Sequence, residues 1–139
     1  MGEIYHLTPA SEFRSGVRDG RYTPARLPED GFVHCAGSVE SALAVADDFF
    51  SGVAEPLLLL RIDPVRLTAK VIFEAPAAIP GAGARHLEVA DRFPHVYGPI
   101  ELAAITGLAR FGRTAAGFAW PERFGSVEEL LDPLESEPA

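Results

Sequence analysis

The order of apolar and polar positions along the chain predicts two helices and about six strands. Apolar and polar residues alternate over residues 3–7, as in a strand with one buried face. Apolar residues recur at helical spacing over residues 39–50, after Ser38, which can cap a helix. A nearly unbroken apolar run over residues 57–62 indicates a central strand covered on both faces. We therefore expect an α+β fold.

The remaining predicted elements are shorter. Thr8 can cap a first helix that has Pro9 in its first turn, continues to residue 18 and ends at Gly20. The other strands are expected at residues 31–36, 68–74, 93–97 and 100–109. Residues 21–30 and 75–84 are rich in proline or glycine and lack an apolar period, which predicts loops.

Composition predicts a folded protein with a single domain. The chain has 139 residues, of which 47% are hydrophobic and 23% charged, values ordinary for globular domains. We expect one domain over residues 1–139, with a core at about 3–110 and a C-terminal extension at 111–139. The sequence leaves the oligomeric state open.

The charge balance limits the partners. Twelve Lys and Arg against 20 Asp and Glu give a net charge of −8, which argues against a nucleic-acid partner but allows a small nucleotide. The single cysteine, Cys35, excludes an intramolecular disulfide. No apolar run reaches transmembrane length and the N-terminus lacks signal-peptide features, so we expect a cytoplasmic protein without membrane contact.

Histidines on separate predicted strands are the main candidates for chemistry. His6, His34 and His95 each lie near the end of a short strand, where folds of this kind place their sites. Side chains alternate along a strand, so His95 and Tyr97 should share a face, with Val96 on the other face. Any one of these histidines could instead be purely structural, and only their number favours a shared site.

Other groups extend this candidate site. Glu74 ends its predicted strand and is the candidate acid, although an exposed strand end is the alternative. Arg61 interrupts an apolar strand and is either an edge charge or an anion-binding group. Arg21 and Arg26 could reach a phosphate or be solvated. Three histidines could ligate zinc, but no fourth ligand or paired spacing accompanies them, so we expect no metal.

Four blocks carry a family resemblance: IYHLT at residues 4–8, GFVHC at 31–35, LLRIDPVRL at 59–67 and FPHVYGPI at 93–100. Together with Glu74, they resemble the pattern of a largely bacterial family, domain of unknown function 952, over residues 4–105. That family is distantly similar to the ADP-ribosyltransferase fold, whose members bind NAD in the cleft of a split β-sandwich.

The resemblance implies an ADP-ribosyltransferase-like split β-sandwich and assigns roles to residues. His6 matches the first-strand position of those enzymes and His34 the second, whereas His95 stands where many carry a glutamate. The residues expected to bind NAD, which would be a substrate, are His6, Thr8, His34 and Arg61. The residues expected at the catalytic corner are His34, His95, Tyr97 and Glu74.

Three hypotheses follow for the function. The first is an ADP-ribosyltransferase-like or 2′-phosphotransferase-like enzyme that binds NAD or an ADP-ribose-type nucleotide. The second is a non-catalytic module in which the same histidines bind a small molecule or a partner. The third, a tri-histidine metal hydrolase, has the least support in the sequence.

Overall fold

The fold is α+β, as the apolar pattern predicts. A computed structural model describes residues 2–74, 93–114 and 117–128. Within these residues the strands form three three-stranded sheets and one two-stranded hairpin. The expected count of about six strands and two helices is wrong, because the described residues contain eleven strands, three α-helices and two 3₁₀ turns. Most of the additional strands are only two residues long.

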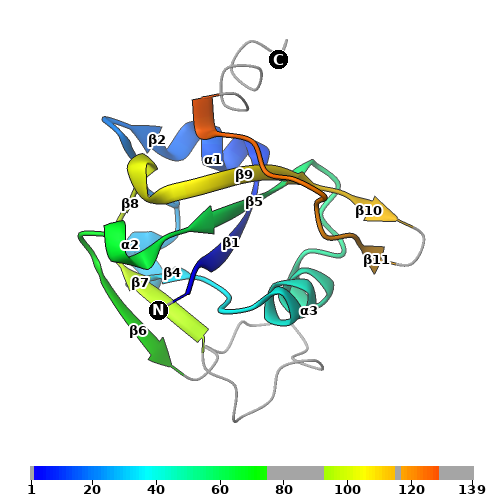
Figure 1. Ribbon diagram of the computed structural model, residues 1–139, viewed down its shortest axis with the longest axis horizontal. Helices are drawn as coiled ribbons and strands as arrows, with labels where there is room; N and C mark the ends of the chain where they lie inside the picture. The colour runs from blue at the N-terminus through cyan, green and yellow to red at the C-terminus, as the bar shows by residue number, and fades with distance from the viewer. Residues whose placement is uncertain (1, 75–92, 115–116, 129–139) are drawn as a thin grey trace.

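The first sheet crosses the middle of the molecule (Figure 1). Its central strand is β5 (Leu57–Ile62), flanked by β1 (Ile4–Pro9) and β9 (Ile105–Phe111), and both pairings are antiparallel. Five of the six residues of β5 are buried, because both of its faces are covered. This confirms the prediction of a central strand.

The second sheet has the order β4-β7-β6. β7 (Phe93–Tyr97) lies between β4 (Val33–His34) and β6 (Lys70–Glu74), antiparallel to both. Val33 is paired with Val96, and both side chains enter the larger core cluster. The residues that alternate with these valines therefore lie on the other face of the sheet, and they include two of the three candidate histidines, His34 and His95.

The segment after β1 differs from the prediction. Thr8 is the fifth residue of β1, not a helix cap, and helix α1 (Ala10–Gly16) begins after Pro9 without a side-chain cap. The helix ends early because β2 (Val17–Arg18) pairs with β3 (Arg21–Tyr22). Asp19 and Gly20 link them with φ of 54° and 76°, as a two-residue hairpin turn requires. Asp-Gly is thus a hairpin turn, not a helix stop.

Helix α3 (Val39–Phe49) is confirmed with its cap, since Ser38 Oγ accepts a hydrogen bond from Ser41 N–H. It covers one face of the first sheet, where Ala46 packs in a cluster with Leu7 and Leu59. Residues 21–30, predicted as a loop, contain β3 and the one-turn helix α2 (Leu27–Asp30).

The strand predicted over residues 100–109 is divided. β8 (Ile100–Glu101) pairs with β3, and the 3₁₀ turn η2 (Leu102–Ala104) then leads into β9. A second 3₁₀ turn, η1 (Pro64–Arg66), follows β5. Two sheets therefore share a stretch that the apolar pattern assigns to one strand.

The described part of the C-terminal extension packs on the core. β10 (Arg113–Thr114) and β11 (Gly117–Phe118) form a hairpin. Trp120 lies edge-on to Tyr5, with ring centroids 5.1 Å apart, and Val127 is buried in the larger core cluster. Within the described residues, no helix is long and apolar enough to cross a membrane.

Candidate functional site

Strand register brings two of the predicted histidines together. His34 on β4 pairs directly with His95 on β7, and their ring centroids are 5.6 Å apart. The two residues differ in exposure, since the His34 side chain is 39% exposed and that of His95 only 3%. Two of the three histidines proposed to share a site therefore lie side by side on one face of this sheet.

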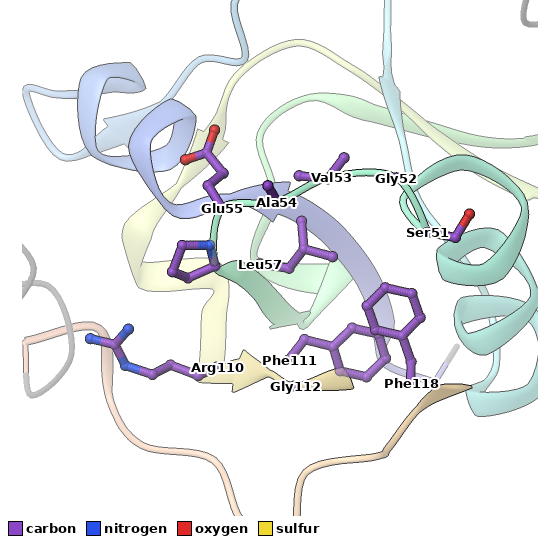
Figure 2. Close-up of a pocket in the computed structure, with 11 residues that line it drawn as sticks. Ser51, Gly52, Val53, Ala54, Glu55, Leu57, Arg110, Phe111, Gly112 and Phe118 are labelled. Atoms are coloured by element: carbon purple, nitrogen blue, oxygen red, sulfur yellow. The ribbon is translucent and has the colours of Figure 1, made fainter. Parts of the chain in front are cut away.

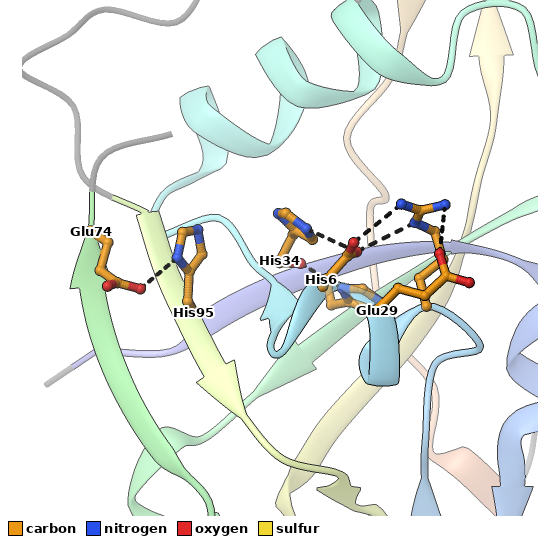
Figure 3. Close-up of polar contacts among 7 residues, drawn as sticks. His6, Glu29, His34, Glu74 and His95 are labelled. Carbon is orange, nitrogen blue, oxygen red and sulfur yellow. Dashed lines mark hydrogen bonds and ion pairs between the residues drawn. The ribbon is translucent and has the colours of Figure 1, made fainter. Parts of the chain in front are cut away.

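Glu74 joins this pair from the edge strand β6. Its Oε1 lies 2.8 Å from Nδ1 of His95, and the same oxygen accepts a hydrogen bond from the Tyr97 hydroxyl. Hydrogen bonds from Tyr97 and His95 hold the pKa of Glu74 below its ordinary value. The hydrogen bond between Tyr97 and Glu74 raises the pKa of Tyr97. A carboxylate that is ionised at neutral pH thus stands beside His95, and Figure 3 shows this contact.

An aromatic ring lies among these polar groups. Phe32 stacks on His95, with ring centroids 4.0 Å apart and an interplanar angle of 21°. It also lies 4.8 Å from His34 and 5.3 Å from Tyr97, centroid to centroid. Sequence reasoning missed Phe32, although strand alternation could have placed it on the face of His34. We call Phe32, His34, Glu74, His95 and Tyr97 the histidine cluster.

Asp30 was also missed by sequence reasoning. Its Oδ2 lies 3.3 Å from Nε2 of His34, and Arg26 donates to both carboxylate oxygens, at 3.2 and 3.4 Å. Burial lowers the pKa of His34, and the Asp30 carboxylate opposes this shift. Arg26, for which the sequence left a solvated and a phosphate-binding role open, thus forms two ion pairs, one with Asp30 and one with Glu29 at 3.5 Å.

His6 meets the cluster through the backbone. Its Nδ1 lies 2.7 Å from the carbonyl oxygen of His34, and its ring centroid is 5.8 Å from that of Tyr22. His6 is 9% exposed, and desolvation by burial lowers its pKa to about 4. At neutral pH His6 is therefore uncharged and donates Nδ1–H to the carbonyl.

Two other predicted residues are not brought into contact with the histidine cluster. Thr8 is 1% exposed, and its hydroxyl accepts a hydrogen bond from Tyr22 at 3.1 Å. Arg61 pairs with Tyr5 on β1, whereas His6 pairs with Leu60, so Arg61 and His6 lie on opposite faces of the sheet.

The contacts of Arg61 are structural. Its Nε donates to the Thr106 hydroxyl at 3.1 Å and lies 3.5 Å from a Glu3 carboxylate oxygen. The guanidinium carbon also lies 4.5 Å from the centroid of the Phe124 ring. Arg61 is not an edge charge, because β5 is the central strand of its sheet, and its guanidinium is instead engaged by Thr106, Glu3 and Phe124.

We next consider whether the described residues could ligate a metal or supply a reactive thiol. Across residues 2–74, 93–114 and 117–128, no three His, Cys, Asp or Glu side chains gather as a metal-ligand set. Cys35 is buried, and burial raises the pKa of its thiol, which disfavours a nucleophilic thiolate.

A cleft of about 490 Å³ opens elsewhere on the molecule (Figure 2). It is lined by residues 51–57, by residues 110–112 at the end of β9, and by Phe118. The rings of Phe111 and Phe118 stack there with centroids 5.1 Å apart. None of the predicted site residues lines this cleft, and no polar motif in the sequence marks it.

Comparisons with other proteins give a family and a set of similar folds. The family described as "Protein of unknown function (DUF952)" matches residues 7–108. The crystal structure of protein CC0527 from Caulobacter crescentus is 26% identical, covers 94% of this chain and 98% of its own, and has a TM-score of 0.65. Its solution NMR structure gives 28% identity, coverages of 85% and 91%, and a TM-score of 0.58. No curated protein matches the chain.

Proposed function

The chain belongs to the family described as "Protein of unknown function (DUF952)", and we propose that its histidine cluster binds NAD or another nucleotide that contains ADP-ribose. The proposal includes an ADP-ribosyltransferase-like split β-sandwich, with the sheets β1-β5-β9 and β4-β7-β6 packed through a shared core. It also includes transfer of the ADP-ribosyl group to an acceptor. In that reaction nicotinamide leaves with the bonding electron pair, and the acceptor forms the new bond to the ribose carbon.

The contact of Glu74 with His95 and Tyr97 is the observation that carries the proposal. If the resemblance to ADP-ribosyltransferases holds, His95 stands where those enzymes often have glutamate, and an imidazole lacks a fixed negative charge at pH 7. The neighbouring strand supplies that charge through Glu74. A carboxylate held next to the reacting ribose would stabilise the positive charge that develops as the glycosidic bond breaks.

The sign of the local charge also fits this ligand. Glu74 contributes a carboxylate to the cluster, and Asp30, which is paired with Arg26, lies beside it at His34; both carboxyl groups have pKa values below their ordinary range. A site with this charge favours a ligand whose reacting part is cationic, as the nicotinamide ring of NAD is. Phe32 adds a half-buried aromatic surface beside the imidazoles, suited to a flat ring.

Non-catalytic binding is the second candidate, and the burial of His95 favours it. With only 3% of its side chain exposed, His95 can be a structural partner of Glu74 and not a group that contacts a reacting atom. Under this alternative a ligand would contact His34, the more exposed imidazole, and no bond would break.

The first experiment measures binding of NAD and of ADP-ribose by calorimetry and by thermal unfolding. At a hundred times its dissociation constant, either ligand should add about 2.7 kcal/mol to the free energy of unfolding. Zinc in a parallel titration tests the metal hydrolase. If neither nucleotide binds, the proposal is wrong.

The second experiment separates catalysis from binding by measuring nicotinamide release. Glu74→Gln preserves the shape of the side chain and removes its charge. We expect release to fall by about 10²–10³-fold, the usual effect of losing one transition-state stabiliser, with little change in NAD affinity. The matched control is Glu40→Gln, an exposed carboxylate on α3. If the wild-type protein binds NAD but releases no nicotinamide, the non-catalytic binding module is the hypothesis that remains.

A further inference from the structure

A chain of contacts from Arg26 through Asp30 ends at one nitrogen of His34. The Asp30 carboxylate is held by two hydrogen bonds from Arg26 and lies 3.3 Å from Nε2 of His34. The Asp30 side chain is only 20% exposed. Burial alone would raise the pKa of Asp30, but Arg26 and His34 outweigh it, so the pKa lies below its ordinary value. Asp30 is therefore an ionised acceptor for Nε2–H of His34.

The backbone fixes this geometry. Arg26 and Asp30 lie at opposite ends of the single turn of α2. Because they are four residues apart in the sequence, the helical turn brings their side chains into contact. Gly31 then adopts φ 83°, the left-handed conformation that reverses the chain at a helix end. This reversal brings His34, at the end of β4, back against Asp30.

The other nitrogen of His34 is available to a ligand. In the described part of the chain, Nε of Arg14 alone is a buried side-chain nitrogen without a partner. Among the described residues, none forms a hydrogen bond with Nδ1 of His34, and 39% of the His34 side chain is exposed, so a ligand can approach this ring. With the proton held on Nε2 by Asp30, Nδ1 carries a lone pair and accepts hydrogen bonds.

We infer that Asp30 is a positioning residue, which holds the proton of neutral His34 on Nε2 and leaves Nδ1 to accept a hydrogen bond from a hydroxyl group of the ligand. The ligand part of this inference rests on the proposed function. A sugar hydroxyl is a donor and suits such a nitrogen, whereas an ionised phosphate oxygen is only an acceptor and does not. His34 would accordingly bind a ribose of the nucleotide and not its pyrophosphate.

The positioning role is tested first in the free protein, by NMR of the imidazole nitrogens. Long-range ¹H–¹⁵N spectra at pH 8 should show His34 with its proton on Nε2. Replacing Asp30 by Asn should lower the pKa of His34, because the carboxylate that stabilises the imidazolium is lost. Glu29→Gln is the matched control, since Glu29 contacts Arg26 but not His34. Asp30→Glu should restore part of the shift.

Two results of this NMR experiment would overturn the inference: a proton on Nδ1 of neutral His34, or an unchanged pKa in Asp30→Asn. The same spectra report whether the variant is folded. A purely structural Asp30 would lower the melting temperature without a specific shift in the His34 titration.

NAD is the probe for the ligand part. Asp30→Asn should weaken NAD binding by about tenfold, the effect of weakening one hydrogen bond, while Glu29→Gln binds as wild type does. Wild-type affinity in a folded Asp30→Asn would refute the ligand role. If the wild-type protein binds no NAD, the proposed function and the ligand role both fail, and the NMR titration still decides the positioning role.

Discussion

His6 should make the protein less stable in mild acid, and the size of the effect follows from its burial. Desolvation lowers the pKa of His6 from 6.5 to about 4 in the folded state. Between these two pKa values the unfolded chain binds a proton that the folded chain does not. Stability from His6 is therefore complete above pH 6.5 and is lost as the pH falls towards 4.

The two pKa values give the magnitude. Each pKa unit corresponds to about 1.36 kcal/mol, so a shift of about 2.5 units limits the loss to about 3 kcal/mol. At pH 4.5 most of this stability should already be lost. Other groups, including the half-buried His34, change stability in the same direction, so the wild-type curve alone does not isolate His6.

The assay compares urea unfolding of the wild type and His6→Gln at pH 7.5, 6.5, 5.5 and 4.5. Gln can still donate a hydrogen bond to the carbonyl of His34, but it does not titrate. The variant should lose about 2–3 kcal/mol less than the wild type between pH 7.5 and 4.5. Equal losses would refute a neutral, buried His6. If the variant does not fold, NMR titration of His6 in the wild type gives its pKa directly, and a value near 6.5 would refute the assignment.

Three further predictions concern stability and are checked by urea unfolding. Ser38→Ala removes the cap of α3 and should cost about 1 kcal/mol; no loss would mean that the cap contributes little. Leu60→Ala empties a fully buried position in β5 and should cost about 3 kcal/mol, and a cost below about 1 kcal/mol would contradict the packing. Gly107→Ala would place Cβ 2.7 Å from Cβ of Phe124 and 2.9 Å from Nη2 of Arg61, so it should destabilise the protein, although alanine elsewhere in a strand is tolerated.

The parts of the fold that the sequence predicts well are those with a strong local signal. The apolar run of β5 and the Ser38 cap of α3 both appear where the pattern places them. Thr8 shows the limit of such signals. Thr-Pro resembles a helix start, but pairing with Leu58 and the hydrogen bond from Tyr22 keep Thr8 in a strand. Tertiary contacts there outweigh the local preference.

Of the candidate site, too, only the part with a local sequence signal could be predicted. Strand alternation predicts that His95 and Tyr97 share a face, and both contact Glu74. Strand order is not visible in the pattern, so the register that pairs His34 with His95 could not be predicted. Asp30 was missed because its contact with His34 depends on the left-handed turn at Gly31.

The most direct test of the proposed ligand site is NAD titration of the ¹⁵N-labelled protein, with the imidazole signals of His34 and His95 observed together. If the nucleotide binds at the histidine cluster, signals of both rings should shift along one saturable curve, and Glu74→Gln should alter the response of His95. Saturating NAD that leaves both imidazoles unchanged would contradict the proposal, even if NAD binds elsewhere on the protein.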